Sequence, residues 1–138
     1  LYVHPSKTST VVSAVICNIE FVVAVAYWTL YFIFSHLLNF DSFSVPLYLD
    51  FAIHLLPWIF LLPHAIAAPK YISFRVSTAS TFMILALYWA SIEYNLRVKD
   101  IPLPYPFMKL SSNFGKIMWL LGFTTVAASN YMILKWLE

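Results

Sequence analysis

The chain has few of the charged side chains that a water-soluble domain needs. Charged residues make up 10% of its 138 residues, whereas a typical soluble domain carries about 25%. Apolar residues reach 62%, and the mean hydropathy is +0.79. Because most of the chain has no side chain that requires water, the composition excludes an ordinary soluble domain. It predicts a single integral membrane domain over residues 1–138.

Cysteine, glycine and clustered positive charge are scarce as well. Cys17 is the only cysteine in the sequence, which excludes an intramolecular disulfide and a cysteine-based metal cage. Two glycines beside 19% aromatic residues exclude a flexible linker. The net charge of +2 forms no basic stripe, so we expect no nucleic-acid partner. The sequence contains no metal-site spacing and no glycine-rich phosphate loop, and we expect no metal or other cofactor.

Four apolar runs dominate the chain instead. They predict transmembrane helices at about 10–34, 45–68, 77–94 and 114–137, because about 20 apolar residues cross a hydrocarbon core of about 30 Å. The predicted fold class is therefore an all-α integral membrane helical bundle. Pro57 predicts a kink in the second helix, because proline cannot donate the backbone hydrogen bond. Lys and Arg are shared equally between the two expected sides. The sequence therefore determines neither the orientation of the helices across the membrane nor whether that membrane is the endoplasmic reticulum or the plasma membrane.

The segments between and at the ends of these runs carry their own signals. Tyr27 and Trp28, near the end of the first run, are interpreted as residues of the membrane interface. The short connection from Pro69 to Val76 makes the second and third helices antiparallel neighbours. Alternating prolines between Arg97 and Asn113 exclude a helix and predict a structured loop.

Ionisable groups within the spans are candidates for function, because each costs about 2.5–3.5 kcal/mol at membrane depth on insertion scales. Glu20, His54 and Glu93 meet this description. Glu20 is either a functional group or a protonated carboxyl hydrogen-bonded to a neighbouring helix. Glu93 is expected near the interface, in an ion pair with Arg97 four residues later.

Asp50 precedes His54 by four residues, so both side chains lie on one face of a helix. A carboxylate that binds one ring nitrogen fixes the tautomer and raises the basicity of the other nitrogen. Such a base can activate a hydroxyl nucleophile. The alternative is a purely structural hydrogen bond, which is common for a lone histidine in a membrane. His54 and Asp50 are therefore the candidate catalytic residues.

Two further patterns occur in a consistent order. The first, Leu49–Leu62, contains His54 followed by an apolar run with Pro57. The second begins at Tyr105-Pro106-Phe107 and continues through Gly115 and Thr124-Thr125 to Asn130-Tyr131. Together these stretches resemble the androgen-induced gene family, also called the FAR-17a-like family.

The resemblance implies a fold with six spans, of which this chain looks like the last four. It also implies hydrolysis of fatty acid esters of hydroxy fatty acids by an intramembrane threonine and a histidine. The matching histidine is His54. Asp50 stands where the family usually has asparagine, and Phe51 stands where it has a first histidine.

The family's threonine lies upstream of the part that this chain matches. Neither Thr8, Thr10 nor Thr29 lies in a matching context, and Thr124 and Thr125 are interpreted as helix-packing residues. No nucleophile is identified in this chain. Two functions remain open: a hydrolase of a lipid ester in the membrane with His54 as general base, or a noncatalytic membrane subunit. The second would bind membrane lipids or a larger membrane-protein partner.

Overall fold

The structure is a computed structural model that describes residues 6–35, 46–99 and 112–138. The elements are α1 (Lys7–Ile33), α2 (Leu47–His54), α3 (Leu56–Ala65), the short 3₁₀ helix η2 (Ala68–Lys70), α4 (Phe74–Lys99) and α6 (Asn113–Leu137). These ranges contain no β-strand, so the predicted all-α class is confirmed. The proline-rich loop predicted between Arg97 and Asn113 lies, apart from its ends, outside the described residues.

Three described segments are long and apolar enough to cross a membrane: Lys7–Ile33, Leu47–Ala65 and Asn113–Leu137. Their outward side chains are apolar, with Phe32 74% and Phe60 70% exposed. Large apolar patches on a protein surface indicate contact with a partner or with lipid. The chain is therefore a membrane protein, as its composition predicts.

The predicted third span differs from the other three in composition. It lies within α4, whose 26 residues are long enough to cross a bilayer. Its last turns contain Glu93, Arg97 and Lys99, and its first half contains several serines and threonines. Because of these polar residues, α4 is not among the helices that are both long and apolar enough to be candidate membrane spans. Composition thus supports three of the four predicted spans.

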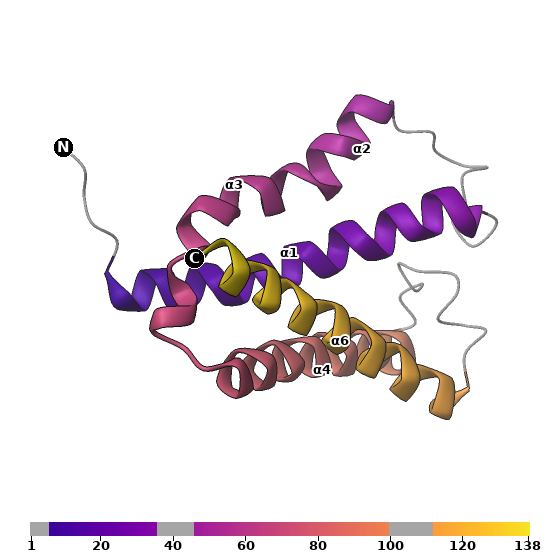
Figure 1. Cartoon of the computed structure of the whole chain (residues 1–138). Helices are drawn as coiled ribbons and strands as arrows, with labels where there is room; N and C mark the ends of the chain where they lie inside the picture. The colour runs from indigo at the N-terminus through magenta and orange to yellow at the C-terminus, as the bar shows by residue number, and fades with distance from the viewer. Residues whose placement is uncertain (1–5, 36–45, 100–111) are drawn as a thin grey trace.

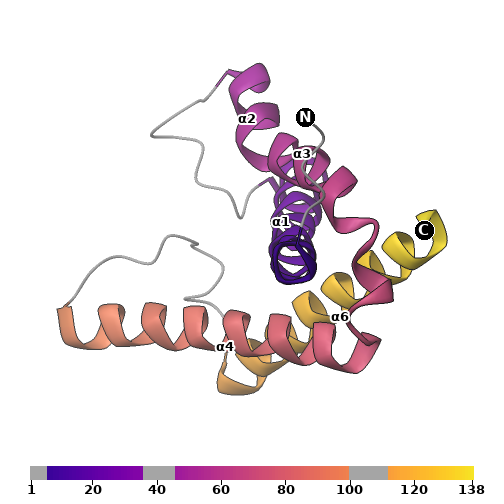
Figure 2. The same cartoon turned by 90° about the vertical axis from the view of Figure 1, so that its left-hand side faces the viewer.

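The helices are grouped around α1. Figure 1 shows α2 and α3 on one side of α1, with α4 and α6 on the other. The expectation that the second and third predicted helices are antiparallel neighbours is therefore wrong, because α1 lies between them. Figure 2 looks along α1, which lies between these two groups. The C-terminal end of α6 lies next to η2, the short helix that follows α3, at one end of the bundle.

Local sequence explains where the helices begin and break. Ser6 and Ser112 cap α1 and α6, each accepting a hydrogen bond from a backbone N–H three residues later. The predicted kink near Pro57 is present as a full break at Leu55, where φ is −127° and ψ is −41°. Pro57 occupies the first turn of α3, where its missing N–H costs least. The break separates α2 from α3.

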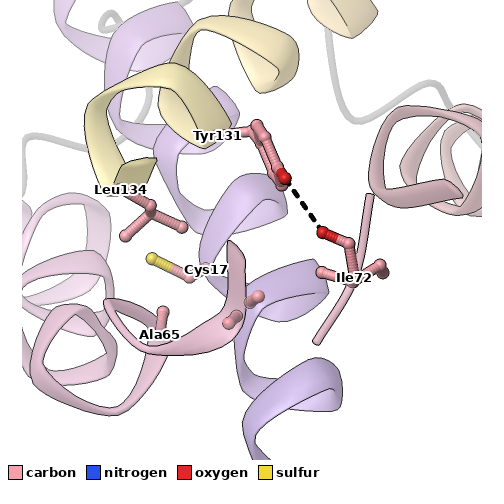
Figure 3. Close-up of a cluster of buried hydrophobic side chains, with 7 residues drawn as sticks. Cys17, Ala65, Ile72, Tyr131 and Leu134 are labelled. Atoms are coloured by element: carbon pink, nitrogen blue, oxygen red, sulfur yellow. Dashed lines mark hydrogen bonds between the residues drawn. The ribbon is translucent and has the colours of Figure 1, made fainter. Parts of the chain in front are cut away.

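A small apolar core holds the end of the bundle where α1, α3, η2 and α6 meet. Cys17, Ala65 and Leu134 are fully buried in it, and Figure 3 shows them facing one another. The hydroxyl of Tyr131 donates to the carbonyl of Ile72 at 2.9 Å, which ties α6 to the segment before α4. Small residues at this contact let the helix backbones approach closely, as in other membrane bundles.

A buried polar network lies beside this core and joins α1, α3, α4 and α6. Asn18 on α1 donates to Ser77 at 3.0 Å and to Thr81 at 3.3 Å, both on α4. Asn130 on α6 donates to the side-chain oxygen of Asn18 at 2.8 Å. The Nε1–H of Trp58 on α3 donates to Asn130 at 3.0 Å. The network therefore fixes the rotation of four helical segments relative to one another.

Candidate functional site

His54 occupies the last turn of α2, beside the break at Leu55. Its Nδ1 lies 3.1 Å from the backbone carbonyl oxygen of Asp50. The carboxylate Oδ1 of Asp50 is farther away, at 3.8 Å from the same nitrogen. The helical spacing brings the two residues together, but the carbonyl, not the carboxylate, makes the close contact.

This contact decides which ring nitrogen of His54 is basic in the neutral state. A carbonyl oxygen can only accept a hydrogen bond, so Nδ1 must carry the proton that it shares with Asp50. Nε2 is then left with its lone pair. An imidazole in this tautomer can accept a proton at Nε2, which is what a general base requires.

Tyr27 of α1 covers one face of the imidazole. The ring centroids of Tyr27 and His54 are 3.5 Å apart, and the planes differ by 4°. The hydroxyl of Tyr27 interacts with the side chain of Asp50, which is 4% exposed. Tyr27 therefore contacts both members of the Asp50–His54 pair, across the boundary between α1 and α2.

His54 also borders a cavity of about 290 Å³. Its lining side chains come from α1, α2, α4 and α6: Val22, Val23, Ala26, Tyr27, Leu30, Ile53, His54, Leu85, Tyr88, Trp89, Ile92, Leu120 and Phe123. Most of them are aliphatic or aromatic, and His54 is the only one of these lining residues with an imidazole, lysine or arginine side chain. A cavity with this lining suits a hydrocarbon chain with one polar group close to the histidine.

Among the residues that the structure describes, no serine or threonine hydroxyl lines this cavity, and the hydroxyls of the lining residues belong to Tyr27 and Tyr88. Thr10 donates to a backbone carbonyl at the start of α1. Thr124 and Thr125 each donate to the carbonyl four residues earlier on α6. Across the same described ranges, no group of three His, Cys, Asp or Glu side chains could hold a metal ion.

The other two ionisable candidates lie elsewhere. Glu93 forms the predicted ion pair with Arg97, whose Nε is 3.2 Å from the carboxylate. It also pairs with Lys116 on α6, a contact that the sequence did not suggest. This cluster joins the ends of α4 and α6. Glu20 is half-buried on α1, and no described side chain is hydrogen-bonded to it.

Tyr27 is the residue of this site that the sequence did not reveal. Its position near the end of an apolar run is typical of an interfacial aromatic residue, and no local pattern links it to His54. The stack depends on how α1 and α2 are rotated toward each other. Tyr27 and His54 lie on different helices, so no regular spacing in the sequence indicates that they are in contact.

Comparison with known proteins extends the sequence pattern. The family model described as FAR-17a/AIG1-like protein matches residues 5–138. The match includes α1, which lies before the first stretch of resemblance seen in the sequence. No curated protein and no solved structure matches the chain.

Proposed function

Since this chain belongs to the FAR-17a/AIG1-like family, we propose that it carries the general base of an intramembrane lipid ester hydrolase. The observation that carries the proposal is His54 at the wall of the apolar cavity, with Nδ1 bound to the Asp50 carbonyl and Nε2 left as the basic nitrogen. A base in an apolar cavity inside a membrane protein can act on a substrate that stays within the bilayer.

In the proposed reaction, Nε2 of His54 takes the proton from a hydroxyl group as its oxygen attacks the ester carbonyl. The tetrahedral intermediate then collapses, and the leaving alkoxide receives the proton from the imidazolium. Water, activated by the same nitrogen, hydrolyses the acyl intermediate and releases a free fatty acid. The hydroxyl nucleophile would be a threonine outside the described residues, as the family resemblance implies.

The cavity suggests the class of substrate. Leu30, Leu85 and Phe123 present apolar surface that is suited to an acyl chain. A fatty acid ester of a hydroxy fatty acid has two such chains joined by one ester group. One chain would lie in the cavity, and the ester carbonyl would lie close to His54.

The test is hydrolysis of such an ester by the full-length protein in lipid nanodiscs. His54→Ala should lower kcat by about 10²–10⁴-fold, the usual contribution of general base catalysis. His64→Ala is the matched control, because His64 is exposed on α3 and is absent from the cavity lining. Wild-type activity in His54→Ala would refute the proposed base.

A noncatalytic role is the second candidate, and the absence of serine and threonine from the described cavity lining favours it. In this case the cavity would bind a membrane lipid, or the chain would serve as a subunit of a larger membrane complex. A fluorophosphonate probe separates the two functions. Covalent labelling of the native full-length protein supports the hydrolase. No labelling, together with copurified lipid or a larger membrane partner, supports the noncatalytic role.

A further inference from the structure

The attachment of α2 to the rest of the bundle is slight. α2 has only eight residues, and the break at Leu55 interrupts its continuity with α3. Among the described residues of α2, Asp50 alone is buried. The orientation of His54 therefore cannot come from a rigid continuous helix, and a contact from another helix has to supply it.

Tyr27 makes that contact. Its ring lies parallel to the imidazole at 3.5 Å, and α1, from which it projects, is the central helix of the bundle. The Asp50 carbonyl fixes the rotation of the imidazole through Nδ1, while the tyrosine face fixes its plane. With either contact alone, the ring could turn into the neighbouring cavity.

We propose that Tyr27 is the positioning residue of this site, holding the His54 imidazole in the plane in which Nδ1 donates to the Asp50 carbonyl and Nε2 is left to accept a proton. This inference rests on the proposed function and adds a second helix to the site. The stack also stabilises the protonated state of the His54 imidazole. An imidazolium over an aromatic face is stabilised by the negative face of the ring, and His54 becomes an imidazolium when it takes the hydroxyl proton.

Two substitutions separate the aromatic face from the hydroxyl. Tyr27→Phe keeps the stack and loses the interaction with Asp50, whereas Tyr27→Leu loses both. Because the stack acts on a charge that develops during the reaction, Tyr27→Leu should lower kcat roughly tenfold, the effect expected of an aromatic–cation contact. KM should change less than twofold. Tyr27→Phe should retain most of the wild-type kcat.

A spectroscopic measurement tests the position of the ring without any need for activity. In the protein labelled at histidine with ¹³C and ¹⁵N, the ring protons of His54 should be shifted upfield by the ring current of Tyr27. The assignment comes from the signals that disappear in His54→Gln. The upfield shift should persist in Tyr27→Phe and vanish in Tyr27→Leu. Tyr48→Leu is the control, because Tyr48 is an exposed tyrosine on α2, the helix that carries His54.

The possible results are distinguishable. Identical His54 shifts in wild type and Tyr27→Leu would overturn the proposed stack, whether or not the protein hydrolyses esters. An equal loss of kcat in Tyr27→Phe and Tyr27→Leu would assign the effect to the hydroxyl and contradict positioning by the ring. A raised KM with unchanged kcat in Tyr27→Leu would show that Tyr27 binds substrate instead. If the wild type proves inactive, the proposed function fails, and the spectra alone decide the position of His54.

Discussion

Replacement of Asn130 by alanine should be among the most damaging single changes in the helical bundle. The Asn130 side chain is fully buried. It donates to Asn18 at 2.8 Å and accepts from Trp58 at 3.0 Å. Alanine removes both interactions at once, together with the weaker contact of the amide nitrogen with the Cys17 sulfur at 3.7 Å. It leaves the side-chain oxygen of Asn18 without its donor and the indole N–H of Trp58 without its acceptor.

The magnitude follows from these two bonds. Side-chain hydrogen bonds between membrane helices average about 0.6 kcal/mol and reach about 1.7 kcal/mol. Two such bonds therefore give about 1–3 kcal/mol, and the space left by the removed amide adds a cavity term. We expect Asn130→Ala to lower the free energy of unfolding by about 2 kcal/mol.

The assay is reversible unfolding in mixed micelles of dodecyl maltoside and SDS, followed by tryptophan fluorescence. Ser129→Ala is the matched control on the same helix, because Ser129 is exposed and its hydroxyl bonds only to the Val126 carbonyl. It should change stability by less than about 0.5 kcal/mol. A double-mutant cycle with Trp58→Phe should show a coupling energy with Asn130→Ala. Equal stability of Asn130→Ala and the control would refute the assignment of the network as the central tie between helices.

Two further predictions concern the cavity and the ends of the bundle. Ala26→Leu should fill part of the cavity and raise KM for long-chain esters more than for short-chain esters. Ala90→Leu, at an exposed position, is the control and should leave the KM for both kinds of ester unchanged. Equal effects of the two substitutions on KM would contradict the proposed acyl site. Lys116→Met should cost about 1 kcal/mol in the same unfolding assay, because both side chains of its ion pair are only 20% exposed. Arg97→Met should cost about 0.3 kcal/mol, because that side chain is 71% exposed and largely solvated; the reverse order would refute the importance of the contact between α4 and α6.

The sequence alone determined the features that depend on composition and on spacing along one helix. Apolar runs long enough to cross a bilayer predicted the membrane class and every long helix that the structure describes. Pro57 predicted the interruption of the second run. The four-residue spacing placed Glu93 next to Arg97 and Asp50 next to His54, because the pitch of an α-helix fixes such pairs without any reference to tertiary structure.

The tertiary structure alone decided which helices face one another and with which side chains. Trp58 and Asn130 are 72 residues apart, and Asn18 and Asn130 are 112 residues apart. Their contacts depend on the rotation and crossing of whole helices, which local periodicity leaves undetermined. The same holds for Tyr27 on His54 and for Lys116 beside Glu93. The sequence could identify His54 as a candidate, but only helix packing supplied the aromatic face and the apolar cavity that surround it.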